Sequence, residues 1–246
     1  EDPGTGTAKP HRRWKYYTPA SSRYGYSGAT SGIDAEGKEY KVFEYSLDDD
    51  NNAIITKYQG NMSALNIPDT LDGHSVVEID ENVFSGKNQL RVVVIPNSVT
   101  NIGNHAFENC ENLTTVILPK GIVSIGWGAF YNCDSLTNIE IPKSLKKTGT
   151  YVSGSYEGVF NNCDNLKTVT FEEGTTKIVN DLFANCPGIE TITIPDTVTE
   201  IQYRAFYGCE NLKEIRIPSS VTNIGEETFF SNKALTRIDI PTSVIN

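Results

Sequence analysis

The sequence lacks the features that mark several protein classes. Its 246 residues contain no apolar run of about 18 residues, which is the length that a membrane-spanning helix needs. Only three His residues are present and no Cys-x-x-Cys spacing occurs, so the sequence predicts no metal site and no cofactor. The formal net charge of −10 excludes a general nucleic-acid binder, because phosphate binding requires a basic surface.

Methionine is almost absent, and positive charge is concentrated at one end. The only Met is Met62, so we expect the chain to begin after a processing step or another cut, with any targeting signal out of view. Residues 1–32 carry five Lys or Arg against two acids, a sum of +3 in a chain whose total is −10. Their content of Gly, Ser, Thr and Pro predicts an extended tail or linker. The embedded stretch HRRWKYY leaves open a segment that contacts a partner or the acidic remainder of the chain.

What the sequence does contain is an internal repeat. Phe recurs at spacings of 23, 23, 30, 23, 23 and 23 residues, and a strand-end residue follows each of these Phe residues by twelve positions. The seven are Phe84, Phe107, Phe130, Phe160, Phe183, Phe206 and Phe229. The strand-end residue is Pro except in the fourth unit, where it is Glu172. Seven units run from about Ile67 to Asp239.

Each unit predicts one turn of a solenoid. In the stretch LTTVILP, Leu113, Val116 and Leu118 have the spacing of a short strand with one buried face. Pro119 ends that strand because it has no N–H to donate. The stretch HAFENC is too short for an independent helix and predicts a single helical or 3-10 turn. One unit cannot bury its own apolar side, whereas stacked units share a continuous core and align their strands in a parallel sheet.

This pattern resembles the leucine-rich repeats of the BspA-like family, which occur mainly in bacterial surface and secreted proteins. The resemblance covers about residues 61–246, although the buried Asn of the better-known leucine-rich pattern is missing. It implies a right-handed, mostly β superhelix of about seven 23-residue units with a concave parallel sheet. It also implies a secreted or cell-surface location, adhesion to host or bacterial surface proteins, and no catalytic site.

Residues 33–60 precede the solenoid of residues 61–246 and predict an N-terminal β-hairpin cap. Two strand-like runs, YKVFEYSL and NAIITKY, flank the polar cluster DDDN, and a repeat array needs its first edge covered. Asp48, Asp50 and Asn52 have the spacing of part of a calcium loop. Neither the Gly nor the distal Glu of such a loop follows, so we interpret the cluster as a turn.

Two insertions interrupt the period, and both fall in the same half of the unit. The first unit is longer by five residues and the fourth by seven. Insertions in repeat proteins lie on one edge, which is often used for binding. The fourth-unit loop, residues 146–158, contains Lys146, Lys147, Tyr151 and Tyr156. It is a candidate recognition loop, because Tyr supplies contact area at low entropic cost, or a tolerated spacer.

The outward positions of the expected concave sheet are further candidates for ligand binding. They lie two and four residues before each strand-end residue, alternating with the core positions. Those we single out are Val92, Val94, Ile117, Glu140, Thr170, Thr193, Glu214, Arg216 and Arg237. The first three would form a small apolar patch, although β-branched residues also suit strands for their own sake. For the charged end an equal alternative to ligand binding is cross-strand ion pairing, of Glu214 with Arg237 and of Arg216 with Asp239.

The five cysteines do not predict chemistry. Cys110 follows His105 by five residues, but four other units carry the equivalent Cys without a His. A thiol nucleophile needs a base that a third group orients. We therefore expect one buried column of cysteines, continued by Lys87 and Asn232 in the end units, and an incidental His105. Disulfides are not expected, since parallel side-chain directions suit the disulfide dihedral angle poorly.

The sequence therefore predicts a non-enzymatic, adhesin-like binding protein of the cell surface or the secreted fraction. It would recognise a protein or glycan on a host or neighbouring cell through the concave sheet and the loop 146–158, and a monomer is favoured. Two alternatives stay open, a structural spacer or scaffold segment of a larger surface protein and a targeting module of an enzyme.

Overall fold

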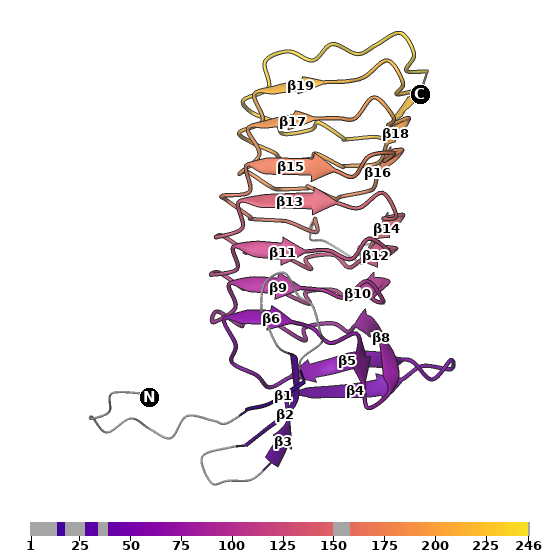
Figure 1. Cartoon of the computed structure of the whole chain (residues 1–246). Helices are drawn as coiled ribbons and strands as arrows, with labels where there is room; N and C mark the ends of the chain where they lie inside the picture. The colour runs from indigo at the N-terminus through magenta and orange to yellow at the C-terminus, as the bar shows by residue number, and fades with distance from the viewer. Residues whose placement is uncertain (1–13, 18–27, 34–38, 150–157, 246) are drawn as a thin grey trace, which may run out of the picture.

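The computed structural model describes residues 14–17, 28–33, 39–149 and 158–245 of the chain. These residues form a mostly β solenoid of about seven turns, stacked in one column (Figure 1). The predicted repeat solenoid is therefore confirmed. Each turn has three sides, which are a strand of a main sheet, a two-residue strand of a second ladder, and a segment of tight turns around the repeated Phe.

The main sheet is formed by one short strand from each unit. Its strands are β6 (Ala64–Asn66), β9 (Val92–Val94), β11 (Thr115–Ile117), β13 (Asn138–Ile141), β15 (Thr168–Phe171), β17 (Thr191–Thr193) and β19 (Glu214–Arg216). Paired strands are parallel and in unit register, so that Thr115 lies opposite Val92. Strand pairing is interrupted between β11 and β13 and again between β15 and β17.

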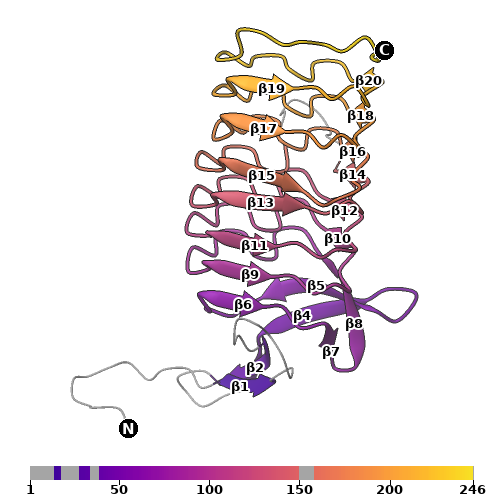
Figure 2. The same cartoon turned by 45° about the horizontal axis from the view of Figure 1, so that its top comes forward.

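The second ladder runs along the adjacent side of the solenoid (Figure 2). Its strands are β8 (His74–Ile79), β10 (Asn101–Ile102), β12 (Ser124–Ile125), β14 (Lys147–Thr148), β16 (Lys177–Ile178), β18 (Glu200–Ile201) and β20 (Asn223–Ile224). A glycine follows several of these strands because the coils approach closely there. A Cβ atom on Gly126 would lie 2.4 Å from the backbone nitrogen of Asn104, a contact that no side chain permits.

The third side contains tight turns, and the expected helical or 3-10 turn is wrong for the described residues. The residues two positions before and two after the Phe have positive φ in nearly every unit, for example His105 at +53° and Asn109 at +55°. A right-handed helix cannot continue through such residues. Their N–H groups instead donate to the next coil, where Asn109 N–H reaches the carbonyl of Tyr131 at 2.8 Å. This side is therefore a backbone hydrogen-bond ladder between coils.

The core is built from columns of identical side chains. Phe84 and Phe107 stack at 4.8 Å between ring centroids, and the column continues to Phe206 and Phe229 at 5.9 Å. The cysteines form a neighbouring buried column without disulfides. Rings of equal size stack closely from coil to coil. The burial of each ring stabilises the folded state by on the order of 1.5–3 kcal/mol.

A hairpin covers the first coil. The strands β4 (Phe43–Leu47) and β5 (Ala53–Tyr58) pair antiparallel, and β5 also pairs in parallel with β8. The ring of Tyr58 packs on Phe84 at 5.0 Å and extends the Phe column. In the hairpin turn the Asp48 carboxylate accepts the N–H groups of Asp50 and Asn52, at 3.0 and 2.8 Å, which fits the interpretation as a turn.

Four further strands differ from or extend the expectations. The strands β1 (Trp14–Tyr17), β2 (Gly28–Ile33) and β3 (Glu39–Lys41) form an antiparallel sheet, so strands lie within residues 1–32, for which an extended tail or linker, or a contact segment, was expected. The five-residue insertion of the first unit is a hairpin in which β7 (Thr70–Leu71) pairs antiparallel with β8.

Candidate ligand-binding face

The outward side chains of the main sheet divide into two groups along the solenoid. Val92, Val94 and Ile117 of β9 and β11 are half-buried. From β13 onward the outward positions are exposed, and of the predicted residues this group includes Glu140, Thr170, Thr193, Glu214, Arg216 and Arg237. The face therefore changes from a half-buried aliphatic end to an exposed polar end.

A cavity of about 450 Å³ lies at the boundary between the two groups. Val94 and Ile117 project into it from β9 and β11, and Pro96 and Pro142 line it at the strand ends. Val116, a core residue with 7% exposure, also lines the cavity. The opening thus reaches between β11 and β13, where strand pairing is interrupted.

Three charged residues line the same cavity. Glu140 and Lys120 form no ion pair within the part of the chain that the structure describes. Glu172 is held in place, because its carboxylate accepts the backbone N–H of Lys143 at 3.1 Å and lies 3.7 Å from the Lys143 Nζ. The cavity thus combines aliphatic side chains with two carboxylates, one ammonium group and the neutral polar side chains of Asn97, Thr115 and Asn138. A mostly apolar pocket with a few polar groups is typical of a ligand-binding site.

Sequence reasoning found part of this site. Val94, Ile117 and Glu140 come together in the cavity, whereas Val92 on the same strand as Val94 does not line it. Lys120 and Glu172 were missed. For Glu172 a signal existed, since it stands where every other unit has Pro. For Lys120 the sequence contains no such signal, because a charged residue follows the strand-end residue in many units.

The cross-strand ion pairs, one of the two alternatives for the charged end, are not found among the described residues. Arg216 pairs with Asp196 at 3.3 Å and Arg237 with Asp239 at 2.8 Å, both between exposed side chains. Cross-strand pairing from β19 would require a strand over residues 237–239, and these residues do not form one. Arg237 therefore pairs with an acid two residues along its own segment, and Arg216 with an acid that follows β17 in the preceding coil.

Of the inserted loop, residues 146–158, the structure describes 146–149 and 158. Lys146 and Lys147 are exposed beside the second ladder. Tyr151 and Tyr156 lie outside the described residues.

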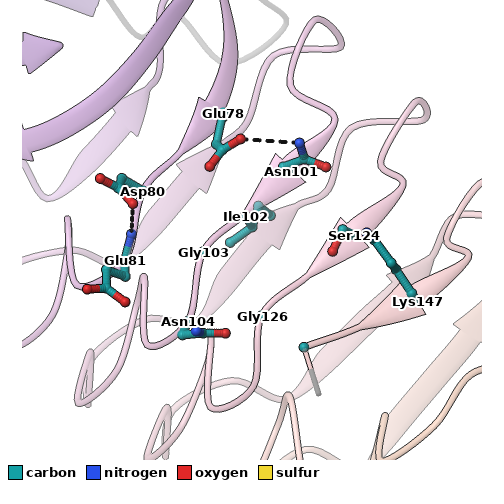
Figure 3. A pocket seen from close by; sticks show the side chains of 11 residues that line it. Glu78, Asp80, Glu81, Asn101, Ile102, Gly103, Asn104, Ser124, Gly126 and Lys147 are labelled. Carbon is teal, nitrogen blue, oxygen red and sulfur yellow. Dashed lines mark hydrogen bonds between the residues drawn. The ribbon is translucent and has the colours of Figure 1, made fainter. Parts of the chain in front are cut away.

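A second, smaller cavity of about 310 Å³ lies on the second ladder (Figure 3). Glu78, Asp80 and Glu81 lie at one end and Lys147 at the other, above a glycine floor. Internal contacts already use two of the three carboxylates, because the Asn101 side-chain amide donates to Glu78 at 3.2 Å and the Glu81 N–H to Asp80 at 2.8 Å. The glycines are explained by the close approach of the coils, so this cavity is the weaker candidate.

With the geometry known, comparison with other proteins identifies the repeat. The family described as the BspA type leucine rich repeat region matches the chain in six copies, over residues 77–156 and 152–246. The chain belongs to this family. No curated protein matches the chain.

Solved structures of leucine-rich repeat proteins share the fold. The T. pallidum leucine-rich repeat protein is 33% identical, with a TM-score of 0.67 over 79% of this chain and 88% of that one. A leucine-rich cell surface protein from Faecalibacterium prausnitzii A2-165 is 34% identical, with a TM-score of 0.59 over 80% of this chain and 52% of that one. This chain thus spans about half the length of that second protein. A leucine-rich repeat protein from Bacteroides ovatus ATCC 8483, at 24% identity and TM-score 0.53, shows the same fold.

In this BspA-type chain the cysteines are bound into the core. The Cys110 thiol donates to the Phe84 carbonyl oxygen of the preceding coil at 3.2 Å, and Cys133 does the same to Phe107 at 3.3 Å. Burial raises the pKa of the Cys110 thiol to about 12. A thiolate is the nucleophilic form, so this environment suppresses reactivity at neutral pH. The sequence did not predict this hydrogen bond between a thiol and a carbonyl oxygen of the preceding coil. Because of it, polar contacts as well as close packing hold the cysteine column together.

His105 has a local structural role. Its Nδ1 lies 3.3 Å from a Glu108 carboxylate oxygen, and its ring packs edge-on against Trp127 with 4.1 Å between ring centroids. The described residues include no group of three or more His, Cys, Asp or Glu side chains able to hold a metal ion. They also include no helix with the length and apolarity needed to cross a membrane.

Proposed function

We propose that this chain is a non-enzymatic binding module of a bacterial cell-surface or secreted protein, and that the outward face of its main sheet recognises the ligand. The cavity over β9, β11 and β13 is the observation that carries the proposal, because it combines aliphatic and polar side chains with Glu140 and Lys120, which form no ion pair in the described chain. Leucine-rich repeat proteins are typically non-enzymatic.

The repeat itself supports this choice of face. Inward positions carry the same residue types in every unit, since they must fit the columns of the core. The outward positions change from Val to Thr to Glu and Arg, although a strand tolerates all of them on a solvent face. A recognition surface can be built at positions that vary between units and have no packing constraint. The name of the F. prausnitzii relative, a leucine-rich cell surface protein, supports the proposed location.

The test is capture of extracellular-matrix and bacterial-surface extracts on two matched double variants. One carries Ile117→Arg and Thr193→Arg on the main sheet, and the other carries Thr176→Arg and Thr199→Arg beside the second ladder. We expect the main-sheet variant to lose at least tenfold in retained ligand, and the control to bind like the unmodified chain. Equal binding by both variants, or no retained ligand, contradicts the proposal and favours a structural spacer in a larger surface protein.

A further inference from the structure

We infer that the C-terminal end of the solenoid is an interface that binds one further polypeptide coil of the same repeat. That coil is entered through residues 241–245 and accepts hydrogen bonds from the backbone N–H groups of Glu227, Phe229 and Ser231. The interface is the outermost coil, drawn in yellow in Figure 1. It is separate from the face of the main sheet to which we assign ligand binding, so the inference does not rest on that assignment.

A ladder of backbone N–H donors ends at this coil. Of the first six coils, all but the fourth donate three N–H groups of the turn segment to carbonyl oxygens of the next coil. In the sixth coil these donors are Arg204, Phe206 and Gly208. The seventh coil has the same conformation, with φ of +56° at Glu227 and +60° at Ser231. Within the part of the chain that the structure describes, however, the N–H groups of Glu227, Phe229 and Ser231 have no acceptor.

The apolar columns are uncovered at the same coil. Phe206 is fully buried, whereas Phe229, the next ring of the column, is only half-buried. Likewise Ile217 is 6% exposed and its equivalent Ile240 is 50% exposed. Asn232 takes the place of the cysteine, and its buried side-chain nitrogen and oxygen have no partner among the described residues. The end coil therefore lacks apolar cover and a polar contact, both of which an adjoining coil can supply.

Residues 241–245 already have the register of another coil. The Ser243 hydroxyl donates to the Val221 carbonyl oxygen at 2.7 Å. One coil earlier, the Ser220 hydroxyl donates to the Val198 carbonyl oxygen at the same distance of 2.7 Å. The segment thus repeats the contact that opens each of these coils, which leads the chain onto the uncovered end.

A second copy of the chain does not match this end. Two C-terminal ends would oppose N–H donors to N–H donors, and an N–H group cannot accept a hydrogen bond. The N-terminal end of a copy would have to stack Phe84 on Phe229, but Tyr58 already lies on Phe84 at 5.0 Å between ring centroids. A coil of the repeat has neither obstacle, because its turn segment offers carbonyl groups to such donors, as Glu226 and Thr228 do to the sixth coil.

The test appends a coil to this chain. A copy of residues 201–223 is joined after residue 246, which keeps the 23-residue spacing of the repeat. The matched control is the same copy carrying Phe206→Asp and Leu212→Asp, two changes that place charge where the core needs apolar side chains.

Amide hydrogen exchange, resolved by NMR, is the measurement. We expect the intact copy to slow exchange at Glu227, Phe229 and Ser231 at least tenfold and to raise the urea midpoint of unfolding. The control copy should change neither. Slow exchange at Arg204 and Phe206, whose N–H groups are already bonded, shows in each protein that the sixth coil remains folded.

Three results contradict the inference. The first is rapid exchange at Glu227, Phe229 and Ser231 beside the intact copy while Arg204 and Phe206 stay protected. The second is equal protection by the control copy, because any attached segment then suffices. The third is a dimer of the unmodified chain, seen by size-exclusion chromatography, in which the three amides are protected; a second copy then replaces the coil as the occupant. Ligand capture is measured on variants of the main sheet, so none of these results bears on the proposed function.

Discussion

The strands of the main sheet carry two sets of side chains that repeat very differently. The inward residues Val93, Val116 and Ile139 keep one chemical type along the array, whereas their outward neighbours Val94, Ile117 and Glu140 change from coil to coil. The inward set lies in a core packed close to crystal density, where a change in volume is felt by both neighbouring coils. The outward set meets solvent and has no such constraint. Repetition therefore identifies the residues that hold the fold, and variation identifies those free for recognition.

The largest expected effect is at the centre of the Phe column. Phe130 is fully buried between Phe107 and Phe160, so Phe130→Ala leaves a cavity that the rigid coils cannot fill. We expect a loss of about 3–5 kcal/mol in the free energy of unfolding, measured by urea denaturation. The matched control is Phe230→Ala, because Phe230 is 59% exposed and lies outside the column; its loss should be below about 1 kcal/mol. Equal losses at the two positions would contradict the columnar core.

Glycine positions extend the same contrast to the backbone. A Cβ atom on Gly126 would meet backbone atoms of the preceding coil at 2.4 Å, whereas on Gly121 it would meet only the Asn97 carbonyl oxygen at 3.3 Å. We expect Gly126→Ala to destabilise by about 2 kcal/mol, as overpacking does, and Gly121→Ala to change stability by less than about 1 kcal/mol. Thermal denaturation followed by circular dichroism measures both. A tolerated Gly126→Ala would mean that the coils can separate at the second ladder.

The sequence predicted the features that depend on repetition. The spacing of the Phe residues predicted the coil length, the parallel alignment of the strands and the buried columns of side chains. Each of these features follows from the equivalence of the units. It did not give the turn segments, since the residues with positive φ before the Phe have nothing in common; they include His105, Asp181, Arg204 and Glu227. Tertiary hydrogen bonds between coils impose that conformation.

Features that depend on departures from repetition were also missed. The cavity arises where pairing between β11 and β13 is interrupted, and no residue type marks that interruption. The ion pairs of Arg216 and Arg237 depend on the choice between several nearby acids, which long flexible side chains make from their actual surroundings. Outward positions could be predicted from the alternation of the strand, but their partners could not.

The cysteine column provides an intermediate test. Cys133 is fully buried and its thiol bonds the Phe107 carbonyl, so Cys133→Ala removes both packing and a weak hydrogen bond. We expect a loss of about 1–2 kcal/mol in thermal or urea unfolding and no change in ligand capture. Thiol labelling of the unmodified native chain should be slow, because burial raises the pKa of the Cys110 and Cys209 thiols to about 12. Rapid labelling would contradict a closed column.

The smallest expected effect is a gain in stability rather than a loss, and it limits the contrast between repeated inward positions and variable outward positions. The position two before the Phe varies in residue type, yet Asp181 in this column is partly buried. Desolvation raises its pKa from 3.8 to about 6, with Arg204 opposing the shift and Glu227 adding to it. Because the folded state disfavours the ionised form, Asp181 lowers stability at neutral pH, and this penalty disappears as pH falls from about 6 to below 4.

Asp181→Asn should therefore stabilise the chain at pH 7.5 by about 1 kcal/mol, less than the full pKa shift would give because the carboxyl is partly exposed. Asn also tolerates the φ of +50° at this position. The gain should vanish at pH 4, whereas Asp69→Asn, on an exposed residue, should give little gain at either pH. Urea denaturation at the two pH values decides, and a gain that persists at pH 4 would refute the charge explanation. A confirmed gain would show that a variable column can still be structural, so that recognition residues must be both variable and outward-facing.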